Sequence, residues 1–71
     1  MEQDSKFPMS PTAFRRWLKD MQRWGVIVDE IEVAPMLGRH PNSILNMKKR
    51  GADLTTALAC QALIQGFGPY R

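Results

Sequence analysis

Residues 29–50 constrain the fold of this chain more than any other stretch, because two short helical patterns lie on either side of Gly38. Small or apolar side chains occur on both sides of this glycine, where two helices would touch: Ala34, Leu37, Ile44 and Met47. Two helices can pack at a steep angle across a three- or four-residue turn only if the contacts are small near the turn and apolar beyond it. The stretch therefore predicts two helices that are joined by a tight turn and pack through these four side chains.

The first helix of this pair is predicted to begin near Glu30, because Asp29 and Glu32 have the spacing of a capping box. Their negative charges also suit a helix N-terminus. Pro35 would be about the sixth residue, where its ring and its missing N–H cost roughly 3 kcal/mol in a regular helix. We therefore expect this helix either to be kinked or to be irregular before Ala34, with only its last turn packing regularly.

The second helix is predicted over residues 41–50, with Pro41 at its first position and Gly51 as its stop. His40 takes the capping position. Imidazole is not a favoured N-cap, so we expect this ring to be free to point outward. Three successive cations, residues 48–50, lie at the negative end of the helix dipole.

The side of this second helix that faces away from Ile44 and Met47 is unusual for a solvated surface. At 100° per residue it carries Asn42, Leu45, Asn46 and Lys49, flanked by Ser43 and Arg50. Asparagine can bind adenine, lysine can reach guanine or phosphate, and leucine can contact the thymine methyl group. Ordinary surface amides would explain the asparagines of an isolated helix. Within a tight helix pair that ends in cations, a base-reading face is the favoured interpretation.

Two more helices are predicted around this pair. Ser10 and Pro11 begin the first, Gly25 ends it, and its apolar stripe consists of Phe14, Trp17, Leu18 and Met21. Its other side holds Arg15, Arg16, Lys19 and Arg23, which we interpret as a solvated face, with phosphate contact by one or two of them as the alternative. Asp53 begins the other helix, over residues 54–65. Residues 1–9 are expected to form a flexible arm from which Phe7 and Met9 can fold back, residues 10–67 the domain, and residues 68–71 a tail.

The composition limits the kinds of protein that this chain can be. Its 71 residues make one small domain with a thin core, and its net charge is +3. The single cysteine, Cys60, excludes an internal disulfide and is expected to be a small core residue, in a protein of the reducing cytoplasm. With one histidine and no phosphate-binding glycine loop, we expect neither an enzyme nor a metal or other cofactor. No apolar run approaches 18 residues, so no membrane contact is expected, and no small-molecule ligand is evident.

These residues resemble the Cro/repressor-type helix-turn-helix domains of phage and bacterial regulators, the XRE-like family. The resemblance covers about residues 10–67 and rests on Asp29, Glu32, Ala34, Leu37, Gly38, His40, Pro41, Asn42, Ser43, Ile44 and Gly51. It implies an all-α fold, a compact lambda repressor-like bundle of four or five helices. In this family the third helix enters the major groove, and the protein usually binds a two-fold DNA site as a homodimer.

The resemblance also implies roles for individual residues. By it, the side chains that contact bases are His40, Asn42, Ser43, Asn46 and Lys49. Those that contact backbone phosphates are Arg39, Lys48 and Arg50. Glu30 departs from the family pattern, because relatives often place a glutamine there that touches phosphate, whereas a carboxylate would repel DNA.

Two functions are therefore in competition. The first is a sequence-specific regulator that binds double-stranded DNA, such as a small prophage-type repressor. Its expected dimer interface is the helix over residues 54–65 together with the segment from Phe67 to Tyr70. The second is a protein-interaction module on the same scaffold, such as an antitoxin-like or phage inhibitor protein. Its contact surface would combine three parts: the irregular helix before Gly38, the acidic residues Asp29, Glu30 and Glu32, and the exposed region Trp24, Val26, Ile27 and Val28.

Overall fold

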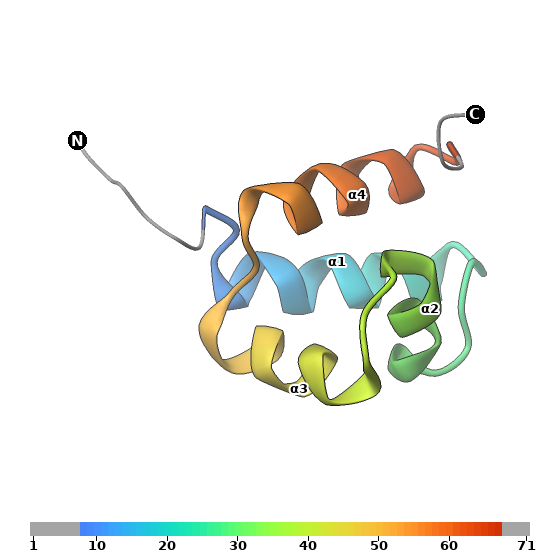
Figure 1. Cartoon of the computed structure of the whole chain (residues 1–71). Helices are drawn as coiled ribbons and strands as arrows, with labels where there is room; N and C mark the ends of the chain where they lie inside the picture. Colours follow the sequence, from blue (N-terminus) through green and yellow to red (C-terminus); the bar gives the residue numbers. More distant parts are fainter. Residues whose placement is uncertain (1–7, 68–71) are drawn as a thin grey trace.

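Helix α1 (Pro11–Arg23) supplies four of the buried residues of the core: Phe14, Trp17, Leu18 and Met21. The computed structural model describes residues 8–67, and within them it is all-α (Figure 1). The chain continues through a 3₁₀ turn, η1 (Glu30–Glu32), and three helices, α2 (Val33–Leu37), α3 (Pro41–Arg50) and α4 (Leu54–Ile64). Figure 1 shows α3 and α4 on opposite sides of α1, with α2 beside the C-terminal end of α1.

Both predicted ends of α1 are confirmed. The hydroxyl of Ser10 accepts a hydrogen bond from the N–H of Ala13 at 3.0 Å, which satisfies one of the unpaired donors of the first turn. At the other end Gly25 has a φ of +77°, and the N–H of Val26 donates to the carbonyl of Met21 at 2.9 Å. This is a Schellman motif, in which glycine supplies the left-handed residue.

The first helix of the tight pair is irregular at its start. Of the two predicted alternatives, a kinked helix and a helix that is irregular before Ala34, the structure shows the second. Residues 30–32 form a 3₁₀ turn, and the carboxylate of Glu32 accepts the N–H of Asp29 at 2.8 Å. The regular helix α2 begins only at Val33, so Pro35 is its third residue. The N–H groups of a first helical turn have no intrahelical acceptor. The proline therefore interrupts no helical hydrogen bond, and the cost of a proline in a helix interior does not arise.

The core is a single cluster between α1 and the other helices. Its buried members are Phe14, Trp17, Leu18, Met21, Ile27, Val33, Ala34, Ile44, Met47, Ala52 and Cys60. The indole N–H of Trp17 donates to the carbonyl of Cys60 at 2.9 Å, which joins α1 to α4 inside this cluster. Cys60 is a core residue, as predicted, and burial raises the pKa of its thiol to about 12.

The chain just before α1 is fastened to the loop after α3. Met9 and Ala52 exchange two backbone hydrogen bonds, of 3.2 and 2.9 Å, and the side chain of Met9 packs against the core. The prediction that Met9 folds back onto the core is thereby confirmed. The folded domain therefore begins at least one residue before residue 10, its predicted first residue. Phe7, the rest of the expected arm and the tail 68–71 lie outside the described residues.

Helix α4 begins as predicted and presents apolar side chains on two sides. The Asp53 carboxylate accepts the N–H of Thr56 at 2.8 Å, and the helix ends at Ile64, one residue before the predicted end. Thr56 and Cys60 face the core, whereas Leu54 and Leu58 are 61% and 63% exposed. Within the part of the chain that the structure describes, α4 and the other helices are each too short or too polar to cross a membrane.

Neighbouring residues of α3 allow a matched test of this packing. Ile44 is 1% exposed and Leu45 is 55% exposed. We expect Ile44→Val to lower the free energy of unfolding by about 0.5–1.5 kcal/mol and Ile44→Ala by about 2–5 kcal/mol, because each leaves a cavity. Leu45→Ala, on the surface, should change it by less than about 0.5 kcal/mol. Urea unfolding followed by circular dichroism measures these differences, and equal losses at both positions would contradict the orientation of α3.

Candidate nucleic-acid interface

A three-residue turn sets the direction in which α3 leaves α2. Gly38 has a φ of +66°, and the N–H of Arg39 donates to the carbonyl of Ala34 at 2.8 Å, which closes a second Schellman motif. His40 then returns to extended backbone, and its Nδ1 accepts the N–H of Asn42 at 3.1 Å. We predicted that the His40 ring would not cap α3 and would be free to point outward. This prediction is wrong, because the ring caps the helix. Because Nδ1 accepts, the ring proton lies on Nε2, the only N–H that this exposed ring offers to a partner.

The two sides of α3 are divided as the sequence predicts. Ile44 and Met47 are buried in the core, and on the facing helix α2 Ala34 is buried while Leu37 packs on the edge of the core. The opposite side of α3 is exposed, and it carries Asn42, Leu45, Asn46 and Lys49. This packing presents two amides, one leucine and one ammonium group together on the surface.

One flank of α3 is tied to η1 and α1. The ammonium group of Lys48 forms an ion pair with Glu30, and both side chains are about one third exposed, at 31% and 33%. The guanidinium group of Arg15 donates to the backbone carbonyl of Lys48. A cation at the last carbonyls of a helix also complements the helix dipole. The Glu30 carboxylate is therefore partnered by a cation at this edge.

The other flank of α3 is tied to the start of α4. Nη2 of Arg39 lies 3.2 Å from Oδ2 of Asp53 and donates to Oγ1 of Thr56 at 2.7 Å. Hydrogen bonds from the hydroxyl and the N–H of Thr56, and to a smaller extent the charge of Arg39, lower the pKa of Asp53. The turn before α3 and the cap of α4 are thus joined by one charged cluster.

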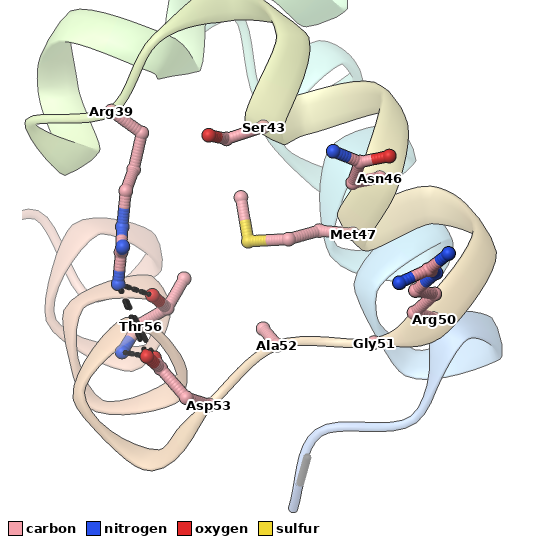
Figure 2. Close-up of a pocket in the computed structure, with 9 residues that line it drawn as sticks. All are labelled: Arg39, Ser43, Asn46, Met47, Arg50, Gly51, Ala52, Asp53 and Thr56. Carbon is pink, nitrogen blue, oxygen red and sulfur yellow. Dashed lines mark hydrogen bonds and ion pairs between the residues drawn. The ribbon is translucent and has the colours of Figure 1, made fainter. Parts of the chain in front are cut away.

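Between this cluster and α3 lies an open cleft of ≈ 230 Å³ (Figure 2). Its lining residues are Arg39, Ser43, Asn46, Met47, Arg50, Gly51, Ala52, Asp53 and Thr56. The cleft therefore shares Asn46 with the exposed side of α3, and Ser43 and Arg50 with its flanks.

The predicted site residues fall into two groups. Asn42, Asn46, Lys49 and Arg50 are exposed and form no side-chain hydrogen bond or ion pair with any residue between 8 and 67, and Ser43 is half-buried at the cleft. Arg39, His40 and Lys48 are held by partners within the chain. The Arg15–Lys48 and Lys48–Glu30 contacts could not be predicted from the sequence, because they join residues 33 and 18 positions apart. Asp53 was identified as a helix cap but not as the partner of Arg39.

The cluster around Asp53 predicts a pH-dependent contribution to stability. A carboxyl group whose pKa is lowered by folding stabilises the folded state above its ordinary pKa of about 3.9, and this contribution is lost as the pH falls through the folded pKa. Asp53→Asn keeps a capping side chain but removes the charge. At pH 7 we expect a loss of less than about 1 kcal/mol, because the pair with Arg39 is solvent-exposed.

Urea unfolding at pH 7 and at pH 3 measures this difference. The difference in the free energy of unfolding between the wild type and Asp53→Asn should become smaller in acid. A difference that is constant with pH would mean that the charge of Asp53 contributes nothing.

No protein-family model, no curated protein and no solved structure matches this chain.

Proposed function

We propose that this protein is a sequence-specific double-stranded DNA-binding regulator of transcription, of the small repressor type, that acts in the cytoplasm without a catalytic role. One observation carries the proposal. Packing of Ile44 and Met47 into the core leaves Asn42, Asn46 and Lys49 exposed on one side of a helix that begins after a three-residue turn. A helix of this kind fits the major groove, which is about 12 Å wide.

The exposed side chains have the chemistry that base recognition requires. Each asparagine amide can donate and accept a hydrogen bond at once, as the N7 and N6 positions of adenine demand. Leu45 is 55% exposed between them and can contact the methyl group of thymine. Lys49 can reach guanine or phosphate. We propose that His40 and Ser43 contact bases at the two edges of this face.

The phosphate contacts come from the flanks of α3. Arg50 is exposed beside the face proposed to read bases, and no carboxylate among residues 8–67 forms an ion pair with it. Arg39 and Lys48 would contact phosphate from within their ion pairs, so their net contribution to affinity should be smaller than that of Arg50. The ion pair between Lys48 and Glu30 supports the proposal, because it offsets the repulsion that a lone carboxylate would exert on DNA.

We also propose that the protein acts as a homodimer through the outer side of α4. This helix has no charged residue along its length, and Leu54, Leu58 and, just beyond it, Phe67 are exposed. A helix that is apolar on two sides is normally covered on both. A second copy of the same uncharged face meets it without repulsion, in an isologous contact in which each subunit offers the same patch. The amides of Gln61 and Gln65 add groups that can both donate and accept.

A second candidate, a protein-interaction module, is favoured by one observation at the other end of the molecule. Trp24 and Val28 are 68% and 79% exposed beside the acidic residues 29–32. Ile27, which the sequence placed on this surface, is instead buried in the core. Binding to a protein that is insensitive to salt, with no binding to any duplex, would favour this candidate over the first.

The DNA-binding proposal is tested by selecting bound sequences from a random duplex pool and then measuring variants on the selected site. Asn46→Ala should lose about 1–3 kcal/mol of discrimination at one base pair. Lys49→Ala, if it contacts only phosphate, should weaken all sequences alike and reduce the slope of log affinity against log salt by about 0.9. Lys19→Ala, on the exposed side of α1, is the matched control. The assignment fails if neither Asn46→Ala nor Lys49→Ala changes affinity for DNA.

The proposed dimer has its own test. Leu58→Glu places a charge on the outer side of α4 and should convert the protein to monomers, because an unpaired charge would be desolvated at the interface. Leu45→Glu introduces the same change at an equally exposed leucine of α3 and should leave the mass of the assembly unchanged. Light scattering after size-exclusion chromatography gives both masses. A wild type that is monomeric at high concentration would contradict the dimer.

A further inference from the structure

The cleft between α3 and the start of α4 has an apolar floor and cationic rims. Figure 2 shows the side chain of Met47 extending into its centre, with Ala52 beside it, and Arg39 and Arg50 on opposite sides. Ser43 and Asn46 lie along the α3 wall. The volume of ≈ 230 Å³ is below the range of about 300–1,000 Å³ that is typical of sites for drug-sized ligands. The cleft is open, so it suits a ligand whose ring lies on the floor while its charged group reaches the rim.

Hydrogen-bond donors outnumber acceptors in this cleft. All the bonds from Arg39 to Asp53 and Thr56 use Nη2, so Nε and Nη1 have no partner among residues 8–67. The side chains of Ser43, Asn46 and Arg50 likewise form no hydrogen bond within this range. The one acidic lining residue, Asp53, already accepts from Thr56 and Arg39. A ligand that complements these walls must bring acceptors and negative charge.

We propose that this cleft binds a small organic anion of the mononucleotide class, a ligand that was not expected from the sequence. The phosphate pairs with Arg50, since arginine holds phosphate through several donors at once. The ring lies on the floor, where the thioether of Met47 makes a favourable contact with an aromatic edge. Acceptors on the ring face the unused donors of Arg39 and the hydroxyl of Ser43.

Such a ligand would compete with DNA. Ser43 and Asn46 belong both to the wall of the cleft and to the face of α3 proposed to read bases. A ligand that occupies the cleft therefore obstructs a duplex on that face, and the protein would release its site as the anion accumulates. This regulatory consequence rests on the proposed DNA binding, whereas anion binding itself does not.

The test is to add each of three probes to the full chain at constant ionic strength. NMR signals of the backbone amides and the methionine methyl groups are recorded at each probe concentration. The probes are adenosine monophosphate, adenosine and inorganic phosphate. We expect millimolar adenosine monophosphate to shift the signals of Met47 and residues 50–53 saturably, and each of the other two probes to bind at least about tenfold more weakly. Arg50→Gln should weaken the nucleotide at least about fivefold, and Lys19→Gln, on α1, should not. Inorganic phosphate that binds as well as the nucleotide, or an unaltered Arg50→Gln, overturns the proposal.

A second experiment adds the DNA duplex selected from the random pool. It distinguishes two phosphates that could occupy the cleft, that of a free nucleotide and that of the DNA backbone. Displacement of that duplex by adenosine monophosphate, but not by adenosine, supports the shared site. Nucleotide binding without any duplex binding would leave the cleft assignment standing and defeat the proposed function. A duplex that shifts the Met47 methyl group while the free nucleotide does not would identify the occupant as backbone phosphate and overturn the small-ligand proposal.

Discussion

The contact of Ile44 and Met47 with the apolar stripe of α1 is the interaction on which the rest of the structure depends. It fixes the rotation of α3 about its own axis, and rotation decides which side chains reach solvent. The left-handed turn at Gly38 supplies the angle at which α3 arrives, because a residue with a Cβ atom would be strained there. Burial of Ile44 and Met47 thereby determines which polar side chains of α3 are exposed on its opposite side.

Charged groups fasten α3 at its edges, and this has a cost for any anionic partner. The Lys48–Glu30 and Arg39–Asp53 pairs hold the helix against η1 and α4. They are surface pairs, so each contributes at most about 1 kcal/mol to folding. Their larger effect is on the electrostatic field, since two of the cations near α3 are already partly neutralised. Positive charge that is not shared with a carboxylate is concentrated at Lys49 and Arg50.

Most of the helices could be predicted because their signals are local. Ser10–Pro11 and Pro41 start helices, and Gly38 and Gly51 end them, through hydrogen bonds that span only a few residues. The 3₁₀ turn before α2 was one of two options, since Pro35 excludes a regular helix without specifying the alternative. The contacts of Arg15 and Arg39 could not be predicted, because they join distant parts of the chain. Capping by His40 was not predicted, because imidazole is not among the side chains that are favoured as helix N-caps.

The backbone hydrogen bonds between Met9 and Ala52 place the N-terminal end of the described residues beside the cleft, whereas the end of α4 does not line it. Ala52 follows α3 almost directly and lines the cleft, so Met9, which pairs with it, lies close to the cleft. Affinity handles, fluorescent reporters or natural fusion partners would be best attached after α4, whose C-terminal end points away from α3 (Figure 1).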